Sequence, residues 1–192
     1  MSQTIPTYEK WIIRYLMAPK LRRAPISQAQ EKFIQHGKNI LRICENFSEQ
    51  QMRQRIQLPR IRGLEPVSMD WSIAMTIEHL MIVANGVASM IDQLIEGKIP
   101  TAPTLAAVKP RDIFTGAQAR QNFEQLLTTW AYRFDMQKII DAPDVTVGHP
   151  WFGPLDAGGW YKMLATHQAL HERQIEILAS AVLSEIGKQS QR

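Results

Sequence analysis

Three histidines have the residue type and spacing of a metal site: His79, His167 and His171. His167 and His171 are four residues apart, so on a helix both imidazoles leave the same face. His79 lies far upstream, in a second apolar segment with helical spacing. Two imidazoles from one helix and a third from a facing helix would hold a divalent ion and leave positions open for water or substrate. The sequence therefore predicts a three-histidine metal site between two helices.

The neighbours of His167 and His171 favour this interpretation. Both histidines share an apolar stripe with Trp160, Leu164 and Leu178. Neutral imidazoles on such a stripe would be buried, and their nitrogens would need partners. A shared divalent ion such as Zn²⁺, Ni²⁺ or Fe²⁺ would satisfy them, because these ions accept imidazole nitrogen. The alternative is a set of hydrogen-bonded core histidines with no ion.

Two polar residues lie next to the predicted ligands. Gln174 follows His171 by about one helical turn, where its side chain could hydrogen-bond a substrate, a metal-bound water or His171 itself. Glu78 precedes His79 directly and therefore points about 100° away from it on a helix. Glu78 is predicted to lie outside the set of ligands, in a supporting or surface position.

The remaining candidates for chemistry have simpler interpretations. His149, in a His-Pro-Trp sequence, is predicted to order its loop, and His36 is predicted to face solvent. Cys44 lies on an apolar stripe and is predicted to be a core residue rather than a nucleophile. Since it is the single cysteine, the chain cannot form an internal disulfide, which favours a reducing cytoplasm.

Apolar residues at three- and four-residue spacing predict an all-α fold, and no segment alternates with the period of a strand. Four long helices suit a four-helix bundle. They are expected over residues 27–47, 70–96, 116–140 and 160–186. Short helices are expected over residues 7–17, ending before Pro19, and over 49–56. Ser27 and Ser48 are predicted N-caps and Gly97 a predicted C-cap, with loops over 57–67, 98–115 and 141–159 and a connector over 20–25.

Composition and charge narrow the class of protein. The 192 residues are 45% hydrophobic, which suits one domain, and no continuous apolar run predicts a transmembrane helix or a signal peptide. Residues 1–62 contain 12 Lys and Arg against 4 Asp and Glu, whereas the rest of the chain is net acidic. This basic third is either a solvated surface or a contact for an acidic partner, lipid or nucleic acid. Nucleic acid is the weakest of these, since no binding motif accompanies the charge.

Several segments together resemble the DinB/YfiT-like superfamily. The C-terminal segment reads His149-Pro-Trp-Phe-Gly, then Trp160, then His167-x-x-x-His171. Upstream, Trp71-Ser72 followed by His79-Leu80 resembles the start of that family's second helix, although Met75 replaces the usual acidic residue. Ser48-Glu-Gln-Gln-Met52 resembles the short acidic turn between its first two helices. The match spans about residues 27–184.

The resemblance implies an up-up-down-down four-helix bundle with long crossover connections, often dimeric. It also implies a divalent ion held by His79, His167 and His171, and a small-molecule substrate used with a low-molecular-weight thiol, since characterised members include thiol-dependent S-transferases and a mycothiol-dependent isomerase. In this interpretation residues 27–192 form the bundle and residues 1–26 a basic N-terminal arm outside the family core.

Three functions follow as hypotheses. The first is a metal-dependent enzyme, an S-transferase or a hydrolase-like protein, in which the ion acts as a Lewis acid. The second is a non-catalytic binding protein on the same bundle, which contacts a partner through its basic N-terminal third. The third is attachment to a membrane surface or to nucleic acid through residues 10–23.

Overall fold

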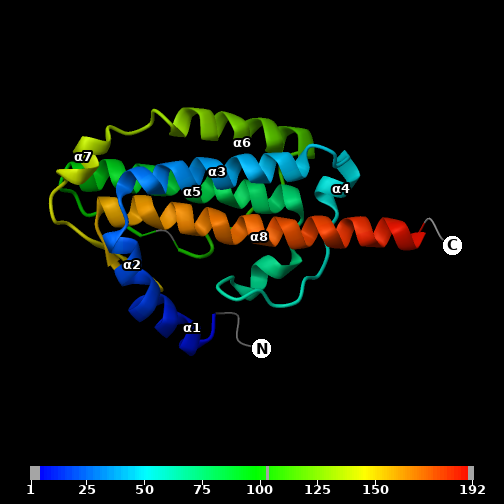
Figure 1. Cartoon of the computed structure of the whole chain (residues 1–192), viewed down its shortest axis with the longest axis horizontal. Helices are drawn as coiled ribbons and strands as arrows, with labels where there is room; N and C mark the ends of the chain where they lie inside the picture. The colour runs from blue at the N-terminus through cyan, green and yellow to red at the C-terminus, as the bar shows by residue number, and fades with distance from the viewer. Residues whose placement is uncertain (1–4, 103, 190–192) are drawn as a thin grey trace.

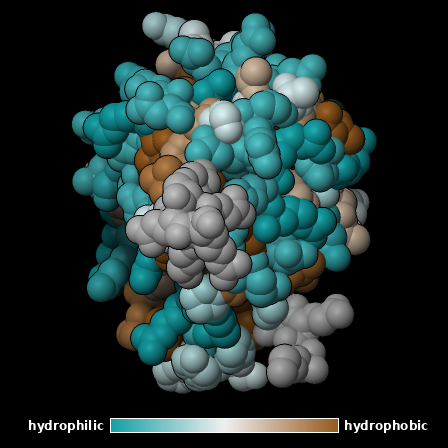
Figure 2. Space-filling model, turned by 90° about the vertical axis from the view of Figure 1, so that its right-hand side faces the viewer, coloured by the Kyte–Doolittle hydropathy of each residue, from teal (hydrophilic) through white to brown (hydrophobic). Residues whose placement is uncertain are grey.

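The computed structural model describes residues 5–102 and 104–189, and helices dominate them. Four long helices lie side by side (Figure 1): α3 (Ile26–Cys44), α5 (Ile73–Ile95), α6 (Gly116–Trp130) and α8 (Ala157–Gln189). Helices α3 and α5 each contact both α6 and α8, so their apolar stripes meet in one core. The end of the molecule shown in Figure 2 is mostly hydrophilic. The all-α prediction is confirmed, apart from the small hairpin of β1 (Val147–His149) and β2 (Gly153–Leu155).

The direction of the helices differs from the prediction. Gln168 Nε2 donates to the Phe33 carbonyl and Asn39 Nδ2 to Glu172 Oε1, so α3 and α8 run the same way. Figure 1 shows α5 and α6 running the opposite way. The order is therefore up-down-down-up, and the predicted up-up-down-down order is wrong. The physical reason is that residues 45–72 reverse the chain at one end, and only residues 96–115 cross from one end of the helices to the other.

Helix α5 is the most deeply buried of the long helices. Ser72 caps it by accepting a hydrogen bond from the Met75 amide, and Gly97, at φ 73°, ends it in a left-handed conformation. Both ends agree with the sequence prediction. Ile73–Ile95 is long and apolar enough to cross a membrane, but 78% of its most apolar window is buried inside the structure. It is a core helix, which is consistent with the expected absence of a transmembrane segment.

Capping residues also account for the shorter elements. The Ser48 side chain accepts from the Gln51 amide and starts α4 (Glu49–Arg53), as predicted, although α4 ends three residues before Ile56. The predicted helix over residues 116–140 is two helices, because Asp135 caps a separate α7 (Met136–Ile140) by accepting from the Gln137 amide. Between Glu65 and Trp71 the loop forms a short 3₁₀ turn, η2 (Pro66–Asp70).

The N-terminal arm is a continuous helical segment, which corrects two predictions. It comprises α1 (Thr7–Ile12), a π-helical turn η1 (Ile13–Met17) and α2 (Ala18–Arg23). The helix does not end before Pro19, and residues 20–23 are not a connector. A proline ring clashes with the carbonyl four residues earlier in a regular α-helix, and the wider π-turn accommodates it. The π-turn also keeps the buried positions before and after it on the same side of the segment. These positions are Ile5, Glu9, Ile13, Ala18 and Leu21. Helix α3 then starts after Pro25, and Ser27 does not cap it.

Gly37 and Gly86 are two helical glycines in opposite surroundings. A Cβ at Gly37 would lie 2.4 Å from Leu127 Cδ2 and 2.7 Å from Gln168 Nε2, both on buried side chains. Displacing them costs about 1–3 kcal/mol, more than the roughly 1 kcal/mol that alanine adds to a helix. We therefore expect Gly37→Ala to lower the free energy of unfolding, measured in urea, by about 1 kcal/mol. Gly86→Ala, with no atom within 4 Å, is the matched control and should raise it. An equal rise in the free energy of unfolding of both variants would contradict the close packing of α3 at Gly37.

Candidate metal centre

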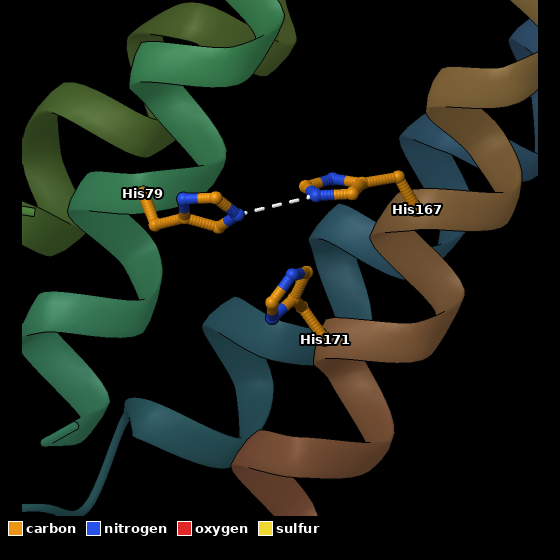
Figure 3. A group of neighbouring side chains, drawn as sticks. All are labelled: His79, His167 and His171. Atoms are coloured by element: carbon orange, nitrogen blue, oxygen red, sulfur yellow. Dashed lines mark hydrogen bonds between the residues drawn. The ribbon is translucent and has the colours of Figure 1, made fainter. Parts of the chain in front are cut away.

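The structure brings His79, His167 and His171 together. His79 lies on α5, and His167 and His171 lie one turn apart on α8, which contacts α5. Figure 3 shows the three rings converging on the space between the two helices. One nitrogen of each ring lies within 4.8 Å of the others, and His79 Nε2 is 3.2 Å from His167 Nε2. The three residues singled out in the sequence therefore share one point, although 88 positions separate the first two.

A backbone carbonyl fixes the tautomer of His79. Its Nδ1 lies 2.6 Å from the carbonyl oxygen of Val108, in the loop between α5 and α6. Since a carbonyl oxygen only accepts, Nδ1 carries the proton and donates it. The neutral ring then holds its lone pair on Nε2, which is the nitrogen that faces His167.

Gln174 does the same for His171. His171 Nδ1 is 2.7 Å from Gln174 Oε1, and Gln174 Nε2 donates to the carbonyl oxygen of Ser68 at 2.6 Å. The second bond orients the amide, because only its nitrogen can donate to a carbonyl. Gln174 Oε1 is therefore the acceptor, His171 donates from Nδ1, and His171 Nε2 keeps its lone pair. Of the contacts expected for Gln174, the structure has the one to His171.

Burial keeps the cluster neutral. Loss of solvent lowers the pKa of His79 to about 4, although the bond to Val108 opposes the shift. The pKa values of His167 and His171 are well below the usual value, first because of burial and then because of the neighbouring histidines. Trp71 covers one side, with its ring centroid 4.9 Å from that of His79. Near neutral pH the cluster consists of three uncharged imidazoles.

The donor set fits a divalent first-row ion. The fixed tautomers leave Nε2 of His79 and His171 as lone pairs, and imidazole lone pairs are typical ligands of such ions. His79 Nε2 faces another imidazole nitrogen at 3.2 Å, and two lone pairs at that distance repel each other. Either a proton on His167 or a cation must lie between them. Three such nitrogens within 4.8 Å could hold a metal ion.

The histidines lie in the wall of a pocket of about 550 Å³. That volume is in the range of small-molecule sites. Its lining is mostly apolar and comes from α5, α8 and three connecting segments, at residues 63–71, 102–109 and 148–151, where residue 103 is not described. Two lining residues have buried polar atoms without a partner among the described residues, Glu65 Oε2 and Trp160 Nε1. Both atoms are themselves buried, so the wall that a ligand would meet is mostly apolar.

Glu78 holds the loop that contacts His79. Its side chain is buried, and its carboxylate accepts hydrogen bonds from the backbone amides of Arg111 and Ile113. These residues follow Val108 closely, so Glu78 fixes the segment that supplies the carbonyl to His79. Its supporting position agrees with the sequence prediction, whereas the alternative of a surface position is wrong.

The other two histidines and the cysteine are accounted for. His149 Nδ1 accepts from the amides of Trp151 and Phe152, which confirms that it orders its loop, and burial lowers its pKa to about 4. His36 is not freely exposed as predicted, because it pairs with Glu172 of α8. Cys44 is fully buried, and burial raises its pKa to about 12, so it is a core residue as predicted.

Comparison with protein families agrees with this geometry. The family model described as the DinB superfamily matches residues 32–175, which is most of the chain. The chain belongs to the DinB superfamily. The matched range includes all three histidines and Gln174. No curated protein and no solved structure matches the chain.

The sequence did not reveal two partners of the site, the carbonyl groups of Val108 and Ser68. Every residue carries such a group, so no residue type marks them. Only the path of the loops places these two oxygens beside His79 and Gln174.

Acid should destabilise the metal-free protein. Between about pH 6.5 and pH 4 the unfolded chain binds protons on imidazoles that stay neutral in the fold. The stability present above pH 6.5 is therefore lost as the pH falls, by up to about 1.4 kcal/mol per pH unit for each imidazole. Urea unfolding at several pH values in this window measures the slope. His149→Asn keeps an acceptor for the Trp151 amide and cannot titrate. The free energy of unfolding of this variant should therefore change less steeply with pH, by the contribution of one histidine. A flat profile in the parent would contradict the neutral cluster.

Proposed function

We propose that this chain binds one divalent metal ion through His79, His167 and His171 and acts on a small molecule in the adjoining pocket. In this proposal the four long helices form a four-helix bundle that holds the ligands rigidly. The observation that carries it is the fixed tautomers of His79 and His171, which leave the Nε2 lone pair of each ring free in a cluster where one nitrogen of each histidine lies within 4.8 Å of the others. Membership of the DinB superfamily supports the same assignment.

The bound ion, in this proposal Zn²⁺, Ni²⁺ or Fe²⁺, would supply a Lewis acid that lowers the pKa of a bound water or thiol. The chain's own residues have distinct tasks around it. Val108 and Gln174 hold the two imidazoles in the binding tautomer. The apolar walls exclude water and bury the hydrocarbon part of the substrate.

For the reaction we propose transfer of a low-molecular-weight thiol to an electrophile, with metal-assisted hydrolysis of a small substrate as the variant. The thiol reaction follows from the family resemblance. The site is compatible with it in two respects. A pocket of about 550 Å³ has room for a thiol beside a small acceptor, and three protein ligands leave coordination positions free.

Metal content tests the ligand set. Protein purified without added metal should contain about one ion per chain by elemental analysis, since three histidines with open positions form a mononuclear site. His167→Ala and His171→Ala should each lower the content at least about tenfold, because two imidazoles bind far more weakly than three. The matched control is His36→Ala, which removes a histidine from the face of α3 that meets Glu172 and should keep the parent content.

Thermal melting of the same proteins separates the first two functional hypotheses. An ion that binds only the folded state adds about 2.7 kcal/mol of stability at a hundredfold excess over its Kd. Zn²⁺ or Ni²⁺ should therefore raise the Tm of the metal-free parent but not that of His171→Ala. If His171→Ala retains the parent's metal, or if metal leaves the parent's Tm unchanged, the metal site is refuted and a non-catalytic binding protein becomes the better description.

The thiol reaction has its own assay. Metal-loaded protein mixed with a small thiol and an aryl halide should consume the thiol faster than buffer alone. Removing the ion with a chelator, or introducing His171→Ala, should return the rate to the uncatalysed value, because the thiolate then forms only at its ordinary pKa. A small ester tests the hydrolytic variant in parallel. A rate that is the same with and without the ion would exclude the thiol reaction while leaving the metal site standing.

A further inference from the structure

The helical part of the N-terminal arm, residues 7–23, which is called the arm below, exposes an apolar stripe to solvent. Trp11 is 61% exposed and Leu16 58% exposed, and the same outer side carries four further large apolar residues, Tyr8, Ile12, Tyr15 and Met17. Positions 8, 11, 12, 15 and 16 follow the three-and-four spacing that normally faces a protein core. A soluble surface does not require six such residues side by side. The stripe therefore needs a partner outside the described part of the chain.

The orientation of the arm is fixed by contacts on its opposite side. The Glu9 carboxylate is buried, lies 2.7 Å from the Arg60 guanidinium and accepts a bond of 3.1 Å from the Gly63 amide. At the other end Arg22 donates to the Pro154 carbonyl at 3.3 Å. Because these contacts hold the inner side against the protein, rotation of the arm cannot bury the stripe without breaking them.

Basic residues accompany the stripe. The arm contains five of them, but Arg22 is bonded to the Pro154 carbonyl and Arg14 reaches the same hairpin at Gly153. Lys10, Lys20 and Arg23 remain, and the single acid, Glu9, is already paired with Arg60. Residues 1–62 as a whole carry 12 basic and 4 acidic residues. A second copy of this face would bring like charges together, which opposes self-association through the arm. The charge therefore favours an anionic partner.

We propose that the arm docks on the surface of an anionic lipid membrane. A helix with tryptophan, tyrosine and aliphatic residues on one side and basic residues beside them is typical of interfacial binding, in which the apolar side enters the boundary between headgroups and acyl chains. The basic residues add attraction to anionic headgroups. Nucleic acid fits less well, because a stripe of Ile12, Leu16 and Met17 has no counterpart on a phosphate backbone. This inference is independent of the proposed metal function.

Vesicle sedimentation with the full chain tests the proposal. The protein should sediment with phosphatidylcholine vesicles that contain phosphatidylserine, sediment less with phosphatidylcholine alone, and be released by salt. The double variant Trp11→Ser with Leu16→Ser should reduce partitioning at least about tenfold, because it removes two large apolar side chains from the lipid. Both residues are exposed, so the Tm should be close to that of the parent.

The matched control removes exposed apolar residues elsewhere. Tyr132 is 88% exposed and Ile99 78% exposed, and both lie outside the arm. Tyr132→Ser with Ile99→Ser should bind vesicles like the parent. Equal losses in the two double variants would refute a role for the arm. Absence of sedimentation with anionic vesicles would overturn the proposal, as would a parent dimer in solution that the arm variant converts to a monomer, since the stripe would then be an interface between two copies.

Discussion

The placement of three neutral imidazoles between α5 and α8, two of them buried and His167 half-buried, is the constraint on which the rest of the site depends. A ring buried in an apolar interior is tolerated only when its nitrogens have partners. His79 obtains one from the Val108 carbonyl and His171 obtains one from Gln174. These bonds tie both loops to the cluster, because Val108 belongs to the segment between α5 and α6 and Gln174 also binds the Ser68 carbonyl before α5. The loops that line the pocket are therefore held by the residues that position the histidines.

The neighbouring residues His79 and Glu78 of α5 have different roles at the site. His79 points toward α8, and Glu78, about 100° around the helix, points toward the loop and accepts from the Arg111 and Ile113 amides. A carboxylate that receives two backbone bonds is a fixed anchor rather than a mobile ligand. The loop can then supply a carbonyl to His79 at 2.6 Å without secondary structure of its own. A helix interior thus positions both the imidazole and the segment that sets its tautomer.

The sequence was sufficient for whatever depends on local pattern. Apolar spacing predicted the long helices, Ser48 marked the start of the short α4 and Gly97 the end of α5, and the apolar stripe on α8 predicted that His167 and His171 face inward. It failed where distant segments decide. The π-turn that carries the arm through Pro19 depends on the surface beneath it, and the pairing of the half-buried His36 depends on Glu172, 136 positions away. The predicted directions of the helices were wrong for the same reason. Apolar spacing does not tell whether a connecting segment reverses the chain at one end of the helices or crosses to the other end. The separate helix α7 was missed for a local reason, because the cap at Asp135 interrupts a stretch that the apolar spacing predicted as one helix.

The arm contacts two of the segments that form the pocket. Glu9 of the arm binds the amide of Gly63, and Gly63 lines the pocket. Arg22 binds the carbonyl of Pro154, in the hairpin whose first strand ends at His149 on the pocket wall. A force that reorients the arm must therefore act on both loops or separate the buried Glu9 carboxylate from the exposed Arg60 guanidinium and the Gly63 amide. A partner bound on the outer stripe keeps the inner contacts intact only if it accepts the arm in its present orientation. An extended, flat surface meets that condition more readily than a groove that must enclose the helix.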